Sequence, residues 1–205
     1  MITYWINSHN RLLKAVSEHI TIVSITMVIA VVIAGIITLF LRNKKVLSNI
    51  VITILSVFYS IPSLALFAIL IPFTGLGRVT AVSALVIYAQ YILVRNFNIG
   101  LQEVDRGVLE AARGMGMSES QIFWKVQFPL SAGSFVAGIK LATTTTIGIA
   151  TIAASINAGG LGSILFDGLR TQNPVKILWG TILTMALCIP VNIILNIVQK
   201  KLYNR

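Results

Sequence analysis

Side chains capable of acid–base, metal or nucleophilic chemistry are few in this 205-residue chain, and they are scattered. His9 and His19 have no partner at the spacing of a metal site, and no acid, base and nucleophile occur together. Cys188 is the single cysteine and lies in an apolar run, so it forms no intramolecular disulfide and is interpreted as a packing residue. The sequence therefore predicts neither catalysis nor a metal site.

Glycine-rich segments can hold phosphate groups, but the pattern required for this is missing. No Gly-x-x-x-x-Gly-Lys-Ser/Thr motif occurs, so the chain is not expected to bind ATP. Gly159, Gly160 and Gly162 follow an apolar run without a strand–helix unit around them, and we interpret them as a turn at the outer surface. If the chain takes part in a process driven by ATP, the ATP must be bound and hydrolysed elsewhere.

The segment 98–130 holds two short predicted helices separated by glycines. Residues 109–113 are good helix formers, and Gly114 and Gly116 can take the left-handed conformation that stops a helix. Ser118 has Gln121 at capping-box spacing. We expect the second helix to begin at Ser118.

That second helix has further signals at both of its ends. Met117 and Ile122 occupy the positions of a hydrophobic staple. The helix is expected to run to about Phe128, where Pro129 interrupts it or opens the next element. An amphipathic helix–turn–helix of this kind is suited to docking against a partner.

Composition indicates that the helices are surrounded by lipid. The chain is 56% hydrophobic and 11% charged, with a mean hydropathy of +0.88. A net charge of +10 could indicate nucleic-acid binding, but the basic residues stand singly or in short clusters between apolar runs. We therefore interpret the basic residues as topology signals, with no nucleic acid as a partner.

Five apolar stretches are long enough to cross a bilayer as helices. They define an all-α polytopic membrane protein with a single transmembrane domain, residues 1–205. The first stretch is too long for the core of a signal peptide and is interpreted as a true span. The predicted spans are about 20–41, 48–72, 79–97, 131–157 and 177–199.

Positive charge is distributed unequally between the connecting segments. With five spans, the favoured orientation has the N-terminus outside and the C-terminus in the cytoplasm. Segment 98–130 is then cytoplasmic. The predicted cytoplasmic cations are Arg42, Lys44, Lys45, Arg95, Arg106, Arg113, Lys125, Lys200, Lys201 and Arg205. The predicted outer cations are Arg11, Lys14, Arg78, Arg170 and Lys176.

Polar residues and prolines inside the spans mark candidate pathway positions. Kinks or helix ends are expected near Pro62, Pro72 and Pro190. In the fourth span, residues 143–146 are all threonines, and Gly148, Thr151 and Ser155 share a face that either packs closely or lines a pore. Lys140 either snorkels or pairs near the inner interface, or faces a central cavity.

The loop sequence resembles the EAA loop of bacterial ATP-binding-cassette (ABC) importer permeases. The spacing of that motif is matched throughout, with valine and phenylalanine in place of isoleucine and leucine. The resemblance implies that this cytoplasmic loop is the coupling helix that fits a cleft in the ATPase. The matching positions are Glu110, Ala111, Ala112, Gly116, Val126, Phe128 and Pro129.

The resemblance extends from about residue 20 to the end. Segments 60–77, 109–123 and 156–169 are similar to the glycine betaine, carnitine and choline branch of these permeases. The resemblance implies the type I importer fold with five spans, in a bacterial plasma membrane. It also implies a second permease chain, two ATPase subunits that bind ATP and Mg²⁺, and an external substrate-binding protein.

A quaternary ammonium osmolyte is the solute that this branch implies. A permanent cation without an in-span carboxylate needs aromatic faces for compensation. Each of these rings could instead pack helices or mark the membrane interface. An importer of the same architecture for methionine or another amino acid, and a membrane enzyme or scaffold, are the alternatives. The candidate rings are Phe58, Tyr59, Tyr88, Tyr91 and Trp179.

Overall fold

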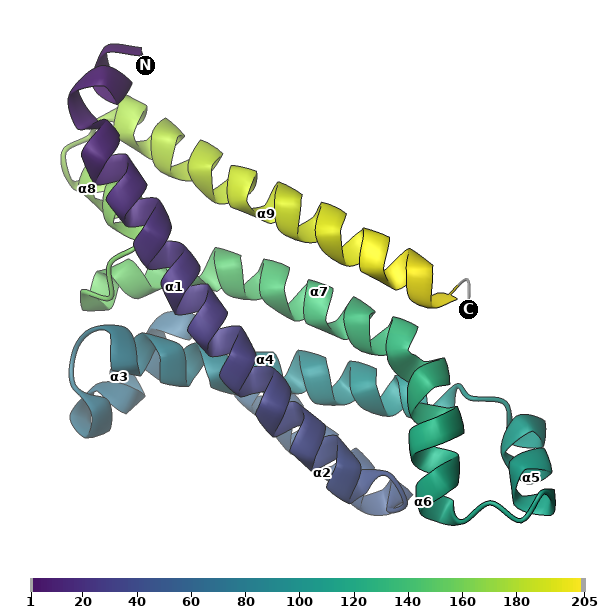
Figure 1. Cartoon of the computed structure of the whole chain (residues 1–205). Helices are drawn as coiled ribbons and strands as arrows, with labels where there is room; N and C mark the ends of the chain where they lie inside the picture. The colour runs from purple at the N-terminus through teal and green to yellow at the C-terminus, as the bar shows by residue number, and fades with distance from the viewer. Residues whose placement is uncertain (1, 204–205) are drawn as a thin grey trace.

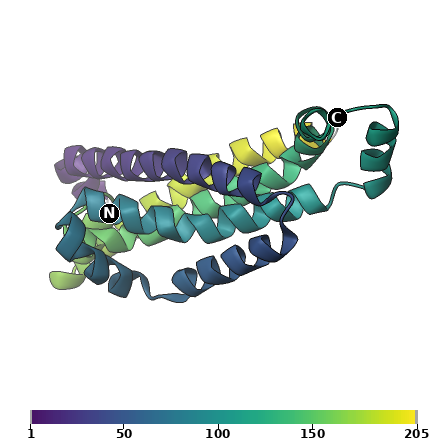
Figure 2. The ribbon, with the colours of Figure 1, turned by 90° about the horizontal axis from the view of Figure 1, so that it is seen from below.

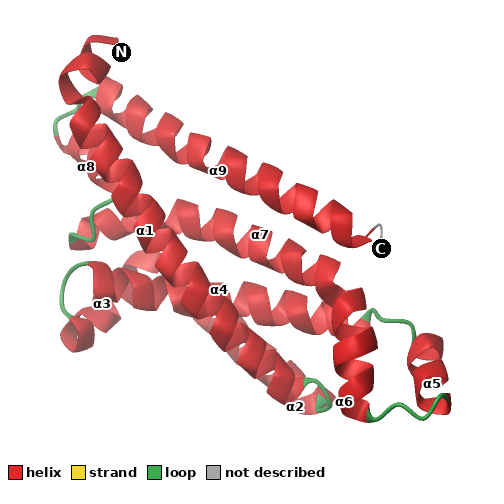
Figure 3. Cartoon of the chain, in the orientation of Figure 1, coloured by secondary structure: helices red, strands yellow, loops and turns green. Residues whose placement is uncertain are grey.

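The computed structural model describes residues 2–203, and every secondary-structure element within that range is helical (Figure 3). This agrees with the all-α prediction. Arg205, one of the predicted cytoplasmic cations, lies outside the described residues. The elements are α1 (Ile2–Leu41), α2 (Lys45–Ser60), α3 (Ser63–Thr74), α4 (Arg78–Gln102), α5 (Arg106–Gly114), α6 (Glu119–Ile122), the π-helix η1 (Phe123–Gln127), α7 (Phe128–Ile152), the 3-10 helix η2 (Ala153–Ile156), α8 (Gly162–Arg170) and α9 (Pro174–Tyr203).

Four helical runs in the described residues are long and apolar enough to cross a membrane. They contain α1, α4, α7 and α9. A fifth crossing is present only if α2 and α3 form one broken span, because these two helices meet at a bend of 97°. The predicted span over 48–72 is therefore present only as a broken span.

The bend between α2 and α3 has a local cause at Pro62. Proline disfavours helical geometry in the residue before it, and Ile61 is extended, with φ −64° and ψ 131°. Pro62 itself lies just before α3 and donates no backbone hydrogen bond. The break expected near Pro62 is confirmed, whereas α9 runs past Pro190 without ending.

Helix α1 begins far before the predicted start of the first span. Its helical residues start at Ile2 instead of near Ile20. The extra turns are held by packing, since Leu12 and Ala15 are buried in a small cluster with two residues near the start of α8. These are Leu161, which directly precedes α8, and Ile164. The hydropathy of the first span alone did not indicate this contact.

Helix α4 is the centre of the bundle and packs against α1, α2, α3 and α7. Small buried residues such as Ala81, Ala84 and Ala89 permit this close approach. Helix α9 packs mainly along α7 and α8, and near its start Trp179 also stacks on Trp5 of α1. Its most apolar stretch has no buried residue, so α9 presents a wide apolar face to lipid or to another chain.

The bundle has two distinct ends, seen in both Figure 1 and Figure 2. At one end, α5 stands apart from the long helices, close to the last turns of α9; we call this the α5 end. The first turns of α1 lie at the other end with α3 and α8, which we call the α8 end. The start of α1 and the end of α9 therefore lie at opposite ends of the bundle, which is the arrangement that five crossings would give.

Candidate coupling and transport sites

Helix α5 is a short, well-capped helix that projects from the bundle (Figure 2). Asp105 caps it, because its Oδ1 accepts hydrogen bonds from the backbone N–H of Gly107 at 2.6 Å and of Val108 at 3.3 Å. Neither end of the helix continues into a long helix of the bundle. Its position is set by the two connecting turns.

The turn after α5 is a glycine turn, as expected. Gly116 has φ +81°, which favours glycine, whereas Gly114 is the last residue of α5 and does not have positive φ. The backbone N–H of Met117 donates to the carbonyl of Ala112 at 3.2 Å and closes the turn. The left-handed conformation predicted for Gly116 is confirmed, whereas Gly114 does not adopt it.

The second loop helix begins as the sequence predicts and continues into α7. Ser118 and Gln121 form a reciprocal capping box. A new element, α7, begins at Phe128 with Pro129 in its first turn, as one of the two expectations had it. The chain nevertheless stays helical across this boundary, because α6, η1, α7 and η2 form one helical run from 119 to 156. The π turn allows this continuity, since it shifts the hydrogen-bond pattern just before Pro129, where the donor that proline lacks is not needed.

The predicted coupling residues separate into a group on the projecting unit and a group near the start of α7. Glu110, Ala111 and Gly116 are exposed on the projecting unit, and Ala112 is buried beneath them. Phe128 is 39% exposed, although its ring centroid lies 5.4 Å from that of Phe135. Val126 is half-buried, and Pro129 is exposed.

Two exposed apolar side chains of the projecting unit were missed by sequence reasoning. Met115 is 75% exposed and Val108 is 44% exposed. Exposed apolar residues on a small helix are suited to an interface. Their exposure depends on which face of α5 turns inward, and the motif spacing does not give that.

Three of the predicted pathway aromatics come together between α2 and α4. The ring of Tyr59 lies 6.0 Å from that of Tyr88 and 5.1 Å from that of Tyr91. The Tyr88 hydroxyl donates to the carbonyl of Ile61 at 2.6 Å, next to the break. Arg95 donates to the Tyr91 hydroxyl at 2.8 Å. This tyrosine cluster braces the bend and has a cation beside it.

The other two predicted rings lie outside the tyrosine cluster. Phe58 is 44% exposed on α2. Trp179 stacks on Trp5, with centroids 5.1 Å apart, where α1 meets α9. Their packing and exposure match the alternative that such rings join helices or mark an interface.

Lys140 pairs with neutral side chains of α9. Its Nζ donates to Asn196 Oδ1 at 2.8 Å and to Gln199 Oε1 at 3.3 Å. These amide oxygens compensate part of the cost of a charge at this depth. Lys140 therefore pairs within its own chain, with two amide side chains of α9.

The remaining pathway candidates lie toward the α8 end. Thr151 donates back to the carbonyl of Gly148 at 2.7 Å, as a hydroxyl within a helix often does. Ser155 is exposed and lines a cavity of about 390 Å³ that Asp167 and Arg170 also line. Thr151 and Ser155 are thus separate from the tyrosine cluster along the chain and the bundle.

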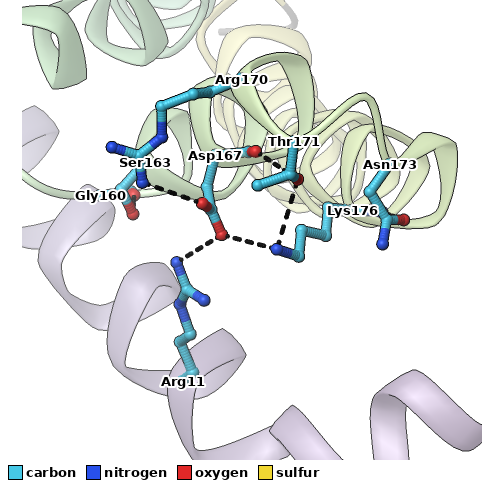
Figure 4. A network of polar contacts seen from close by, with 8 residues as sticks. All are labelled: Arg11, Gly160, Ser163, Asp167, Arg170, Thr171, Asn173 and Lys176. Carbon is cyan, nitrogen blue, oxygen red and sulfur yellow. Dashed lines mark hydrogen bonds and ion pairs between the residues drawn. The ribbon is translucent and has the colours of Figure 1, made fainter.

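An ion-pair network at the α8 end was not expected from the sequence (Figure 4). Asp167 of α8 accepts from Arg11 of α1 at 2.9 Å, from Lys176 of α9 at 3.0 Å and from Arg170 at 3.3 Å. These cations lower the pKa of Asp167 from 3.8 to about 2, and the hydrogen bond from Lys176 is the largest cause. One carboxylate therefore joins three helices.

A second acidic residue binds near the same end. Glu18 of α1 pairs with Arg78 at 3.1 Å and accepts the backbone N–H of Gly160 at 3.0 Å. Each acid lies more than 140 residues from one of its partners in the sequence, so local patterns could not indicate the contacts. Together the two acids hold the glycine turn and α8 against α1.

Removing the charge of Asp167 should destabilise the protein. A lowered folded pKa stabilises the fold above the ordinary value of 3.8, and this contribution is lost as pH falls toward about 2. We expect Asp167→Asn to lower Tm by a few degrees at pH 7. The difference from wild type should shrink as pH falls through this window.

Glu119→Gln is the matched control, because the Arg113–Glu119 pair is exposed on both sides and is screened by water. Thermal unfolding of the purified protein at several pH values measures both effects. Equal Tm losses in the two variants would contradict a special role for Asp167.

The geometry defines a class of protein before any comparison is made. It is a polytopic helical membrane protein with a projecting, exposed helix–turn unit, and no group of metal-ligating side chains occurs within residues 2–203. The sequence matches the family described as "Binding-protein-dependent transport system inner membrane component" over residues 7–205. The chain belongs to this family, as its loop resemblance predicted.

Two relatives cover nearly the whole chain. The carnitine transport permease protein OpuCB of Listeria monocytogenes is 35% identical over 202 residues, covering 98% of this chain and 93% of that protein. The choline transport system permease protein OpuBB of Bacillus subtilis is 35% identical over 191 residues, covering 93% and 88%. The chain is therefore a non-catalytic transport component that works with an ATPase and a binding protein.

Solved structures support the same fold. The chain superimposes on the inward-facing MetNI methionine ABC transporter with a TM-score of 0.85 and 23% identity, covering 93% of this chain and 95% of that one. An amino acid ABC transporter with histidines gives a TM-score of 0.78 at 17% identity, covering 96% of both chains. At these identities the likeness concerns the helical fold alone.

Proposed function

We propose that this chain is the permease subunit of an ATP-driven importer for quaternary ammonium osmoprotectants such as glycine betaine, carnitine and choline. The observation that carries the proposal is the full-length identity to permeases named for carnitine and for choline. A third relative, the glycine betaine/carnitine/choline permease OpuCB of Bacillus subtilis, is 32% identical over 201 residues. The solutes in these names all carry a trimethylammonium group.

The proposed architecture has five spans, with α2 and α3 as one broken span. The exposed unit around Glu110, Ala111 and Gly116 docks into the ATPase, supported by its projection from the bundle. Val126, Phe128 and Pro129 support the base of this coupling loop. ATP and Mg²⁺ bind to the ATPase partners, and no cofactor binds to this chain.

Transport requires a second permease chain, either a copy of this one or a related subunit. The apolar face of α9, which has no buried residue in its most apolar stretch, provides surface for lipid or for that chain. A substrate-binding protein docks at the α8 end and supplies most of the affinity for solute. Closure of the ATPases then draws the two coupling loops together and opens the pathway outward.

Inside the membrane, a trimethylammonium solute would pass weak aromatic sites instead of a carboxylate. The tyrosine cluster supplies ring faces worth about 0.5–2 kcal/mol each in cation–π contact. Arg95 occupies one side of Tyr91, with its guanidinium carbon 5.7 Å from the ring centroid. Tyr59 is the better candidate in this structure, because Tyr88 is 3% exposed. Lys140, Thr151 and Ser155 remain pathway candidates by position.

The solute can be tested by ATP-dependent uptake. The permease is reconstituted with its ATPase and binding protein, and labelled betaine, carnitine and choline are compared with methionine. We expect at least one of the three trimethylammonium solutes to accumulate and methionine not to do so. Uptake of methionine alone would refute the proposed solute and leave the family assignment intact.

Ergothioneine is a second candidate solute on a specific observation. The ergothioneine transport permease/ergothioneine binding protein EgtU of Helicobacter pylori is 39% identical over 125 residues, covering 61% of this chain and 23% of that protein. The same uptake assay includes labelled ergothioneine. Uptake of ergothioneine without betaine, carnitine or choline would replace the first candidate.

The proposed orientation has the α8 end outside and the α5 end in the cytoplasm of a bacterial cell. The distribution of cations supports it. Single cysteines at the exposed positions Asn7 and Lys201, in a Cys188→Ala background, test it. Impermeant maleimide added to intact cells should label position 7, and position 201 only after permeabilisation; the reverse pattern would overturn the orientation.

A further inference from the structure

Two cavities of different chemistry adjoin at the α5 end. An apolar groove of about 330 Å³ runs along α1, α4 and α7. A polar pocket of about 340 Å³ lies between the end of α1, the start of α2, the end of α4 and α5. Leu101 lines both of them, so the apolar groove and the polar pocket adjoin at this residue.

The groove is lined almost entirely by hydrocarbon. Val31, Gly35 and Leu39 of α1 form one wall, and Phe97, Phe135 and Ile139 form the other. Thr38 contributes the one hydroxyl of the described lining, and its Oγ1 is buried without a hydrogen-bond partner. A groove of this composition at membrane depth suits an acyl chain.

The polar pocket carries three cations and no acidic lining residue. Arg42, Lys45 and Arg106 contribute their side chains, and the remaining polar lining residues are neutral. Ser48 also lines the pocket, is 1% exposed, and has a buried Oγ without a partner among the described residues. None of the three cations forms an ion pair among the described residues, although the charge of Arg42 acts on Glu119 nearby. Together with the Ser48 hydroxyl, this positive charge is complementary to a phosphate ester.

The position of Arg42 links the two cavities. Its guanidinium carbon lies 4.4 Å from the centroid of Phe123, which lines the groove, while Arg42 itself lines the polar pocket. Arg42 directly follows the last residue of α1. The polar pocket is therefore at the level where the apolar helix ends, which is the level of lipid headgroups.

We propose that this composite surface binds one anionic phospholipid. Its phosphate and charged headgroup occupy the pocket of Arg42, Lys45 and Arg106, and one acyl chain lies in the groove. Basic pockets between membrane helices on the cytoplasmic side recognise anionic headgroups in this way. Because Arg106 belongs to α5 and Arg42 follows α1, the bound lipid joins the projecting helix to the bundle.

The test uses the full chain copurified with its ATPase and measures Tm during titration with phosphatidylglycerol or phosphatidylcholine of equal chain length. We expect phosphatidylglycerol to stabilise the complex and to bind more tightly. Each of Arg42→Gln, Lys45→Gln and Arg106→Gln should weaken that binding roughly fivefold. Lys200→Gln and Lys201→Gln remove exposed charges outside the pocket and should leave it unchanged.

A second pair of variants tests the acyl chain separately. An added Cβ meets nothing within 4 Å at Gly35 or at Gly148, and only Gly35 lines the groove. Gly35→Leu should fill the groove and abolish the preference for phosphatidylglycerol, whereas Gly148→Leu should keep it. This comparison separates the lipid site from a general loss of folding.

Three results would overturn the proposal. Equal stabilisation by the two lipids would show ordinary membrane contact. Equal stabilisation by soluble glycerol 3-phosphate would assign the pocket to a free anion. Loss of lipid binding when the ATPase is present, with full binding to the permease alone, would assign the cations to an acidic surface of the ATPase.

Discussion

Replacing Gly116 with valine is expected to abolish solute uptake while the chain remains in the membrane. Gly116 has φ +81° in the turn that sets the direction of α5. A side chain in the left-handed region costs about 1–2 kcal/mol, and a β-branched one costs more. The turn would relax to another conformation, and Glu110 and Ala111 would lose the position from which we propose that they dock. ATP-dependent uptake and copurification with the ATPase measure the effect.

Gly114→Val is the matched control for this prediction. Gly114 is also exposed and also has no neighbour within 4 Å of an added Cβ, but it lies in α5 without positive φ. We expect the Gly114 variant to retain most of its uptake and the Gly116 variant to lose it. Equal uptake by both would remove the turn geometry from the coupling mechanism.

Charge reversal at the docking surface tests the same loop without straining the backbone. Glu110 is exposed on α5, so Glu110→Lys should fold and insert normally. We expect it to abolish uptake and to weaken copurification with the ATPase. Wild-type uptake by this variant would mean that Glu110 is not part of the contact.

The largest loss of stability is expected for Gly162→Ala. An added Cβ at Gly162 would lie 1.8 Å from the carbonyl oxygen of Thr151 and 2.8 Å from the Cβ of Ala154. Backbone atoms supply the closest contact, so no rotamer change relieves it. We expect a destabilisation of more than about 3 kcal/mol, with most of the chain absent from the membrane fraction.

Gly148→Ala is the control for this loss, because an added Cβ there meets nothing within 4 Å. It should insert at the wild-type level and gain a little helix stability. Membrane-fraction immunoblots and Tm of the purified protein compare the two variants. Normal insertion and Tm for Gly162→Ala would show that α8 does not pack as closely as described.

The sequence predicted those parts of the loop that local chemistry determines. The capping box of Ser118 and Gln121 and the turn at Gly116 depend on residues within a few positions of one another. The turn at residues 159–162 was also expected, but the sequence did not show why glycine is needed there. Gly162 is needed because α8 approaches the carbonyl of Thr151, a contact that no spacing rule contains.

Features that depend on distant contacts were not predictable. The length of α1 is set by its packing on Leu161 and Ile164, not by hydropathy. The partners of Asp167 come from three helices. The sequence suggested five aromatic residues for the pathway but could not show which of them are in contact. The packing of α2 on α4 brings together three of them, Tyr59, Tyr88 and Tyr91. Each case required the tertiary arrangement.

The unbroken helical run from 119 to 156 gives the loop a mechanical role. Figure 1 shows the run changing direction between α6 and α7, so α6 and α7 form two arms that meet at an angle. The 25 residues of α7 span roughly 37 Å, and a rotation of about 5° at the loop would move its far end by about 3 Å. That end bears on α8 through Thr151 and Gly162. We therefore expect a small push on α6 to be delivered as a displacement at the α8 end.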